Sequence, residues 1–406
     1  MPPTDIPNAP PLRPVFLAKS SGQRADHPDR VRTSVSGING LTLRAEPTWN
    51  DGSSETTPGA DGSIGVVSGG RGHASGRGGS DGCALRTARG RGDHAGPRFD
   101  LTVPPDGYAW WYIDGISDDG ERAISVIAFI GSVFSPWYRW SGRRDPHNNV
   151  CINVATYGRG GRFTMTDRGR AALRQSPERF TVGPSSLHWT GDRLEISVDE
   201  RGGPPFFGRI RGKITVTPSA ISDQELPLTP DGAHIWRPFA PVSDISVDLD
   251  AKGWRWKGHG YFDANFGTRA LEADFDDWTW GRYPTRQGAT CFYDARHRDG
   301  GTLSASIDFS PDGDARMVDA PPTARLPRSL WAVARTTRAD SGHTPRQVKA
   351  MLDAPFYTRA MVETKIRGER STGVHEALDL TRFRSPLLMP MLACRVPRRA
   401  GWRFTD

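Results

Sequence analysis

Two short segments of the chain, residues 234–236 and 261–263, combine a carboxyl group with aromatic rings and a histidine. Residues two apart on a strand point to the same face, so His234 pairs with Trp236 and Tyr261 pairs with Asp263. A carboxyl group surrounded by aromatic faces is desolvated, which disfavours its anion and keeps a proton available. If the two segments face each other, they supply an acid that can protonate an unactivated double bond.

Such a protonation would leave a tertiary carbocation, which water then captures to give an alcohol. We assign proton donation to Asp263. His234 is assigned to re-protonating or orienting Asp263, or to deprotonating the water, and His259 is a rival base that the sequence does not separate from it. The rings of Trp236 and Tyr261 would stabilise the cation by about 0.5–2 kcal/mol each. An enzymatic barrier reduction is at least ~8 kcal/mol, so acid strength and exclusion of water must supply most of the effect.

Each of these residues also has a structural interpretation. By spacing alone, Asp263 resembles a turn residue before Ala-Asn-Phe-Gly, and His234 resembles a hydrogen-bonded core histidine. Trp236 fits a β-core position equally well. The neighbouring acids Asp276 and Asp277 resemble the carboxylate pair of a glycosidase, but adjacent residues on a strand point to opposite faces.

The elements that must position these residues are predicted to be β-strands. From residue 99 onward, short alternating or β-branched apolar stretches recur between Gly, Asp and Asn turns, which is typical of an antiparallel sandwich or barrel. The predicted strands are 123–134, 150–157, 162–166, 186–189, 194–198, 209–217, 246–249, 253–262, 270–280, 289–295 and 303–309. The fold class is therefore mainly β.

One helix is predicted near the end of the chain. Thr344 and Gln347 have the spacing of a capping box, Pro345 occupies the first helical position, and residues 348, 351 and 352 form an apolar stripe. Pro355 ends or kinks it.

Composition divides the chain into three parts. Residues 1–95 include Gly/Arg/Ser-rich sequence that buries too little apolar surface to fold, so we expect a disordered extension, with an RNA-binding tail as its functional alternative. The proline-rich segment 224–231 is a candidate linker. It would separate a first β module, residues 96–225, from a second, residues 226–406.

Charge and cysteine usage exclude several classes. The formal charge is +7, without the motifs of a nucleic-acid-binding protein, and the four cysteines are scattered rather than paired as in zinc or disulfide scaffolds. We expect no metal, no cofactor and no nucleic-acid partner. The start of the chain lacks the pattern of a signal peptide, and its longest apolar run is too short for a membrane span. We therefore expect a cytoplasmic protein.

The sequence from about residue 96 resembles the acyclic carotenoid 1,2-hydratases (hydroxyneurosporene synthases) of purple photosynthetic bacteria, and residues 1–95 lie outside the resemblance. It is carried by Gly107-Tyr-Ala-Trp-Trp-Tyr-Ile-Asp114, Ile130-Gly-Ser-Val-Phe-Ser-Pro-Trp-Tyr138, His147-Asn-Asn-Val-Cys-Ile-Asn153, His234-Ile-Trp-Arg-Pro-Phe-Ala-Pro241, Gly258-His-Gly-Tyr-Phe-Asp-Ala-Asn-Phe-Gly267 and Asp277-Trp-Thr-Trp-Gly-Arg282.

This resemblance implies a cofactor-free hydro-lyase that adds water to the terminal 1,2 double bond of neurosporene- or lycopene-type carotenes. It also implies a lipocalin-like fold of two β-barrel modules. The residues proposed for catalysis in the family correspond to His234, Trp236, Tyr261 and Asp263. This correspondence, rather than their spacing, favours the catalytic interpretation of these four residues over the structural one. An acyclic carotenoid and water are the expected partners.

The substrate would come from a membrane, so we expect peripheral membrane contact. The apolar stretch 386–392, followed by several arginines, fits an interface with anionic head groups or a tail docked on the barrel. Trp278, Trp280 and His259 are candidate substrate-binding residues. Trp137 is another, and it either lines a polyene tunnel or simply packs.

Two rival functions are also considered. A lipocalin-like carrier of a lipophilic ligand would need the same aromatic pocket but no proton donor. A secreted hydrolase or glycan-binding sandwich would explain the thirteen tryptophans. The lack of a signal peptide and of a Gly-x-Ser-x-Gly elbow counts against the second rival.

Overall fold

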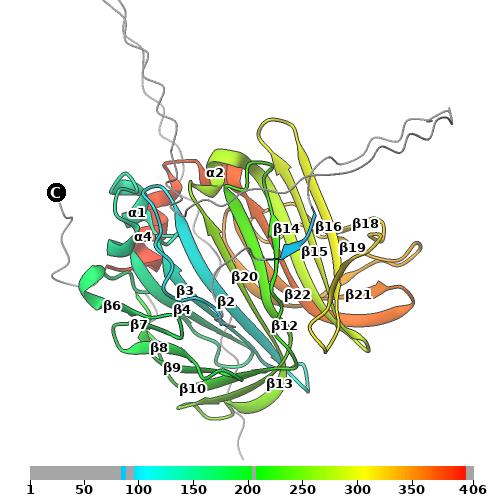
Figure 1. Ribbon diagram of the computed structural model, residues 1–406, viewed down its shortest axis with the longest axis horizontal. Helices are drawn as coiled ribbons and strands as arrows, with labels where there is room; N and C mark the ends of the chain where they lie inside the picture. The colour runs from blue at the N-terminus through cyan, green and yellow to red at the C-terminus, as the bar shows by residue number, and fades with distance from the viewer. Residues whose placement is uncertain (1–83, 88–95, 204–206, 399–406) are drawn as a thin grey trace, which may run out of the picture. The chain divides into compact units, whose positions relative to one another are not determined.

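Strands from residue 108 onward form two large antiparallel sheets (Figure 1). The computed structural model describes residues 84–87, 96–203 and 207–398. The prediction of a disordered extension falls largely on residues 1–83 and 88–95, which lie outside this part of the chain. Within it, strand β1 (Arg86–Thr87) pairs with a later strand, which corrects the prediction for those two residues.

The first sheet runs in the order β5-β4-β3-β2-β13-β12-β10-β9-β8-β7-β6, and β11 pairs with both β12 and β1. Its strands are β2 (Tyr108–Ser117), β3 (Ala123–Ile130), β4 (Val150–Tyr157), β5 (Phe163–Thr164), β6 (Leu173–Gln175), β7 (Arg179–Val182), β8 (Ser185–Trp189), β9 (Leu194–Arg201), β10 (Arg209–Pro218), β11 (Gln224–Pro227), β12 (His234–Leu249) and β13 (Arg255–Gly267).

The second sheet runs in the order β17-β16-β15-β14-β22-β21-β20. Its strands are β14 (Phe275–Thr285), β15 (Gly288–His297), β16 (Thr302–Phe309), β17 (Ala315–Met317), β20 (Arg346–Asp353), β21 (Tyr357–Ile366) and β22 (Glu369–Asp379), and β18 (Thr323–Leu326) pairs separately with β19 (Arg335–Arg338). The prediction of a mainly β, antiparallel fold is confirmed.

Helices are short in the described part of the chain: α1 (Pro136–Trp140), α2 (Leu271–Asp274), α3 (Leu380–Phe383), α4 (Leu388–Arg395) and the 3₁₀ turns η1 (Pro146–Asn148) and η2 (Arg170–Ala172). None of the helices described here has the length and apolar character needed to cross a membrane.

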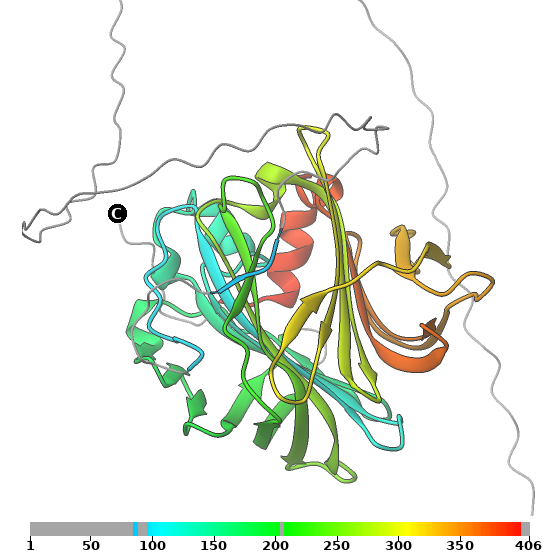
Figure 2. The same cartoon turned by 45° about the vertical axis from the view of Figure 1, so that its right-hand side comes forward.

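The central strands of the first sheet are covered on both faces. The sheet curls (Figure 2), so that one face of β2 and β13 packs into a core enclosed by β3, β4 and β7–β10. Trp111 and Phe262 belong to that core. The alternate residues, among them Tyr112 and Tyr261, belong to a second core that is shared with the second sheet. Because both faces of β2 are buried, its sequence is almost entirely apolar instead of alternating between apolar and polar residues.

The helix predicted at residues 344–352 is wrong, because this segment is strand β20, paired with β21. The register shifts between Gln347 and Lys349 and again between Ala350 and Leu352. Each irregularity breaks the two-residue alternation of a strand. The apolar residues 348, 351 and 352 therefore fall at intervals that imitate a helix.

The predicted linker at residues 224–231 is also wrong. Leu226 and Leu228 are fully buried, and β11 pairs with β12 through Leu226 and Trp236. The chain changes sheets later, between β13 and β14, at residues 268–274. Strands β12 and β13 therefore lie in the first sheet, although the division at residue 225 assigns them to the second module. The division into two modules stays a prediction.

Candidate active site

A small cavity of ≈ 40 Å³ lies between the two sheets. It holds only about three or four water molecules, since one water needs about 10–15 Å³. The lining residues come from both sheets: Trp110 and Tyr112 (β2), Trp236 (β12), Asp263 and Asn265 (β13), Trp278 and Trp280 (β14), Tyr293 (β15) and Glu376 (β22). Six of these nine residues are aromatic, and two are carboxylic acids.

Asp263 is held between two core residues. Phe262 and Ala264 point into the core of the first sheet, which turns the side chain of Asp263 toward the second sheet. Its Oδ2 accepts hydrogen bonds of 2.8 Å each from Trp236 Nε1 and Tyr261 Oη. These contacts confirm that Trp236, Tyr261 and Asp263 come together.

The other oxygen of Asp263 is available for chemistry. Asp263 Oδ1 is buried, and within the described residues no donor or acceptor reaches it. Burial raises the pKa of Asp263 to about 8, although the hydrogen bonds from Trp236 and Tyr261 lower it, and the charge of Glu376 raises it further. At neutral pH the carboxyl group is therefore mostly protonated.

Aromatic rings surround the acid. The ring centroids of Tyr261 and Trp280 lie 5.2 Å apart, those of Trp236 and Tyr293 5.7 Å apart, and those of Trp278 and Tyr293 5.8 Å apart. Their π faces attract positive charge, most strongly where water is excluded. Trp278 and Trp280, predicted as substrate-binding residues, thus lie in the wall of the cavity.

His234 belongs to a different network. Its Nδ1 lies 2.8 Å from Tyr108 Oη, and its Nε2 lies 2.6 Å from Asp274 Oδ2. Arg269 Nε also donates to Asp274 Oδ2 at 2.6 Å. Burial lowers the pKa of His234, while the contact with Asp274 raises it. Both ring nitrogens are therefore occupied by neighbours other than Asp263.

Strand register explains this separation. His234 is paired with Gly267, four residues beyond Asp263 on β13, which corresponds to ~13 Å along the strand. Glycine is required there, because a Cβ atom at position 267 would lie 2.6 Å from the Tyr108 ring and 2.8 Å from His234 Nδ1. His234 thus shares a face with Trp236, as predicted, without touching the acid.

His259 also stands apart from the acid. Its Nδ1 lies 2.7 Å from Arg282 Nη1, and burial together with the charge of Arg282 lowers its pKa to about 3. Arg282 forms a buried ion pair with Asp114, which also accepts a 2.8 Å hydrogen bond from Tyr112 Oη. His259 is not part of the cavity lining.

Sequence reasoning missed the second carboxylate of the cavity, Glu376. Arg359 Nε donates to Glu376 Oε1 at 2.6 Å, and Arg359 Nη1 donates to Ser125 Oγ at 2.6 Å and to Tyr157 Oη at 3.0 Å. The Arg359 guanidinium also lies 5.0 Å from the centre of the Tyr112 ring. The signal available in the sequence was one charged residue within each of the segments 357–362 and 373–378, neither of which was predicted as a strand, and this signal identifies no partner.

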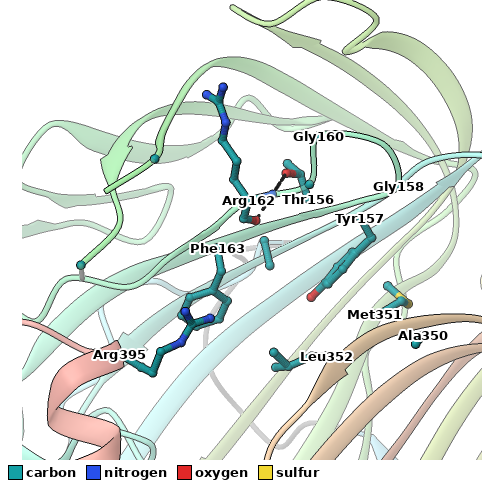
Figure 3. A pocket seen from close by; sticks show the side chains of 14 residues that line it. Thr156, Tyr157, Gly158, Gly160, Arg162, Phe163, Ala350, Met351, Leu352 and Arg395 are labelled. Carbon is teal, nitrogen blue, oxygen red and sulfur yellow. Dashed lines mark hydrogen bonds between the residues drawn. The ribbon is translucent and has the colours of Figure 1, made fainter. Parts of the chain in front are cut away.

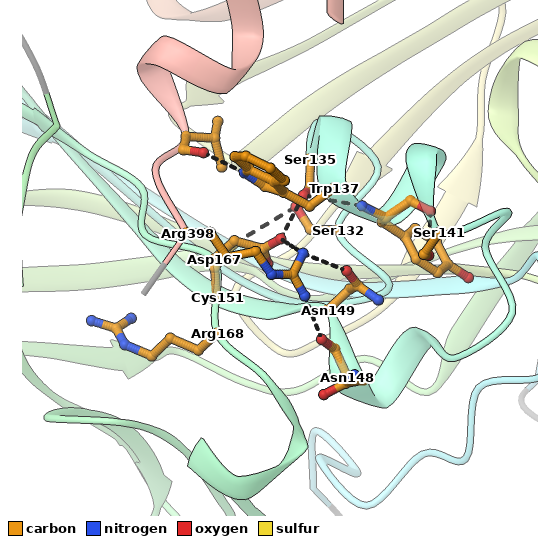
Figure 4. A network of polar contacts seen from close by, with 12 residues as sticks. Ser132, Ser135, Trp137, Ser141, Asn148, Asn149, Cys151, Asp167, Arg168 and Arg398 are labelled. Carbon is orange, nitrogen blue, oxygen red and sulfur yellow. Dashed lines mark hydrogen bonds and ion pairs between the residues drawn. The ribbon is translucent and has the colours of Figure 1, made fainter. Parts of the chain in front are cut away.

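Trp137 lies away from the cavity lining, at the C-terminal segment (Figure 4). Its Nε1 donates to the carbonyl oxygen of Val396 at 2.7 Å, and the guanidinium of Arg398 lies 5.8 Å from its ring. Arg398 is paired at 3.2 Å with the fully buried Asp167, which also accepts a 2.6 Å hydrogen bond from Ser135 Oγ. Burial raises the pKa of Asp167 to about 6. Trp137 thus contacts the C-terminal segment, and its role in substrate binding stays a prediction.

Comparison with known proteins relates the chain to a family. The model of the carotenoid hydratase family CrtC matches residues 126–405. Proteins named acyclic carotenoid 1,2-hydratase from Cereibacter sphaeroides and Rhodobacter capsulatus are 64% and 57% identical over 280 and 282 residues, covering 69% of this chain and 100% of each relative.

A relative of the same name from Thiocapsa roseopersicina is 42% identical over 384 residues, 93% of this chain and 95% of that protein. This match leaves 7% of the chain uncovered, fewer than 95 residues, so the similarity extends into residues 1–95, which corrects the expectation that they lie outside it. Kievitone hydratase from Nectria haematococca, a solved structure, aligns at 10% identity with a TM-score of 0.43, covering 68% of this chain and 90% of that chain. On the family match and these identities, the chain belongs to the carotenoid hydratase family.

Proposed function

We propose that this protein is an acyclic carotenoid 1,2-hydratase that adds water to the terminal double bond of neurosporene- or lycopene-type carotenes, with Asp263 as the acid. The observation that carries the proposal is a buried carboxyl group in an aromatic cavity, with one oxygen that has no hydrogen-bond partner among the described residues. Burial raises the pKa of this group to about 8, which favours its protonated form. A non-catalytic carrier needs an aromatic pocket but no such proton donor.

Hydration begins with transfer of the Asp263 proton to the less substituted alkene carbon, which leaves a tertiary cation. Trp236 Nε1 and Tyr261 Oη hold Oδ2 in place before the transfer. After the transfer, the same two hydrogen bonds stabilise the new carboxylate, because hydrogen bonds to an ionised acceptor are stronger. The cation forms among the rings of Trp278 and Trp280, which stabilise it until water arrives.

The attacking water is activated from the opposite sheet by Glu376. Trp280 and Glu376 are directly paired on β14 and β22, and both line the cavity. Trp280 Nε1 is buried and has no hydrogen-bond partner in the described part of the chain. It can therefore donate to a water whose proton Glu376 accepts as the C–O bond forms. That proton returns to Asp263 through cavity water, so the cycle consumes one water and no other reagent.

His234 acts as a positioning residue rather than as the base. Its contacts with Tyr108 and Asp274 fix the start of β12, two residues before Trp236. Trp236 in turn donates to the acid. Loss of His234 is therefore transmitted to Asp263 through the orientation of Trp236.

Isotope labelling tests the proposed reaction directly. Purified protein incubated with lycopene or neurosporene in H₂¹⁸O and D₂O should give a tertiary alcohol with solvent oxygen on carbon 1 and solvent hydrogen on carbon 2. Oxygen derived from O₂ would indicate an oxygenase and refute hydration. Bound carotene recovered without product would instead identify a carrier.

The hydration rate should fall at alkaline pH. The pKa of Asp263 is raised to about 8, so the acid is protonated and active below this pH and ionised above it. The expected kcat declines about tenfold per pH unit above pH ~8. Stopped assays across pH 6–10 measure the profile, with circular dichroism at each pH as the control for folding. A rate that still rises between pH 8 and 10 contradicts a protonated Asp263.

We also propose that α4 contacts the membrane that supplies the carotene. In the segment 386–392, Met389 is buried, whereas Leu387 and Met391 are 84% and 41% exposed. Trp140, on the adjacent helix α1, is 48% exposed. Arg395 ends α4 and adds positive charge beside these apolar side chains.

Replacing Leu387 and Met391 by glutamate should reduce co-sedimentation with anionic phospholipid vesicles by about tenfold, because each exposed apolar side chain contributes to interfacial binding. Leu330, which is 89% exposed in the loop between β18 and β19, provides the matched control, Leu330→Glu. An equal loss of binding in the control contradicts the assignment of α4.

A further inference from the structure

A second, larger cavity opens where the two sheets are not closed. Strand β5 is one edge of the first sheet, and β20 is one edge of the second. Between them lies a cavity of ≈ 660 Å³ (Figure 3). We call it the edge groove and define it by Ala155, Tyr157, Phe163, Ala350, Met351 and Leu352. Tyr157 and Phe163 lie across the opening from Met351 and Leu352.

The edge groove shares its apolar lining with the core around the acid. Tyr157 and Ala155 belong to the same buried cluster as Trp236 and Tyr261, and Phe163, Met351 and Leu352 pack against that cluster. Side chains from the walls of both cavities therefore belong to one packed core between the sheets.

The side chain of Arg359 links the lining of the groove to the lining of the cavity. Arg359 donates to the hydroxyl of Tyr157, which lines the groove, and to Glu376, which lines the cavity. Its guanidinium also covers the ring of Tyr112, another residue of the cavity wall. A ligand that extends from the groove toward Asp263 would therefore meet Arg359 and Tyr157.

We propose that the edge groove binds the polyene body of the acyclic carotenoid, with the terminal isoprene unit directed past Tyr157 and Arg359 to Asp263. This inference rests on the proposed function. The cavity at the acid is ≈ 40 Å³, so most of a C40 hydrocarbon must lie elsewhere. The groove, at ≈ 660 Å³, is within the ~300–1,000 Å³ typical of ligand sites. Its apolar side chains fit a hydrocarbon, and several glycines together with Thr156, Arg162 and Arg395 complete the lining.

Position 350 allows a sharp test. Ala350 is exposed on the edge strand β20 and lines the groove, so Ala350→Trp fills the opening without disturbing the core. Val348, on the same strand, is 42% exposed and is absent from the lining, so Val348→Trp is the matched control. Binding of lycopene is measured by quenching of tryptophan fluorescence, and turnover is measured with lycopene and with a C10 acyclic terpene that has the same terminal double bond.

Ala350→Trp should weaken lycopene binding at least tenfold and lower kcat/KM for lycopene relative to the C10 terpene by at least tenfold. Val348→Trp should match the wild type in both measurements. Wild-type lycopene affinity in Ala350→Trp overturns the groove assignment, as does an equal loss for both substrates. Because binding is measured separately from turnover, absence of alcohol from the wild-type protein refutes the proposed reaction alone.

Discussion

Asp263→Asn should leave a folded protein that binds carotene and forms alcohol at least ~10³-fold more slowly than the wild type. The amide keeps an oxygen that accepts the hydrogen bonds from Trp236 and Tyr261, but it cannot act as an acid. General acid catalysis alone contributes about 10²–10⁴-fold, and here no cation forms without it. Product analysis by chromatography measures the loss.

Asp248→Asn is the matched control for this variant. Asp248 lies on the same sheet, is 55% exposed and accepts a 3.0 Å hydrogen bond from Arg255. We expect wild-type turnover from it.

Stability provides a second readout, because a raised pKa makes ionisation of buried Asp263 oppose folding. The wild-type free energy of unfolding should fall as pH rises from the ordinary aspartate range to about 8, and Asp263→Asn should lack this decline. Full turnover by Asp263→Asn would assign the acid to another residue.

Glu376→Gln should separate proton transfer from water addition. Asp263 can still deuterate the alkene in D₂O, but water is no longer deprotonated, so the cation returns its original hydrogen to Asp263. Alcohol formation should fall by ~100-fold or more. The recovered carotene should carry deuterium on carbon 2, which mass spectrometry detects. Asp263→Asn, by comparison, should give neither alcohol nor exchange.

Glu363→Gln is the control for loss of an arginine-paired glutamate. Glu363 lies on β21 and pairs with Arg346 at 3.0 Å, away from the cavity lining. We expect normal hydration from it. Alcohol formation at the wild-type rate by Glu376→Gln contradicts the base assignment. Loss of both alcohol and deuterium exchange also contradicts it, because Glu376 would then be needed for protonation.

The sequence predicts which side chains share a face of one strand, because this depends on short-range geometry, whereas the proposed role of Asp263 as the acid came from the resemblance to the hydratase family. Tyr261 and Asp263 share a face because side chains two residues apart on a strand point the same way. Trp278 and Trp280 share a face for the same reason, and both line the cavity. Each of these relationships lies within one strand. The structure accordingly brings Asp263, Tyr261, Trp278 and Trp280 together at one cavity.

The distance between His234 and Asp263 depends on register, which the sequence does not display. Pairing of His234 with Gly267 places the imidazole four residues along β13 from the acid. Glu376 escapes prediction for a related reason, since more than 100 residues separate it from Asp263 and the two meet only when the sheets pack. In β20, two register shifts replace strand alternation with spacing that imitates a helix.

The proposed acid and the proposed base come from opposite sheets, so the proposed reaction requires both sheets. Asp263 is fixed by β2 and β12, and Glu376 by β14 and β21. The proposed reaction therefore depends on how the two sheets pack against each other. Exchange of either sheet for an unrelated one would leave the remaining catalytic residue without its proposed partner.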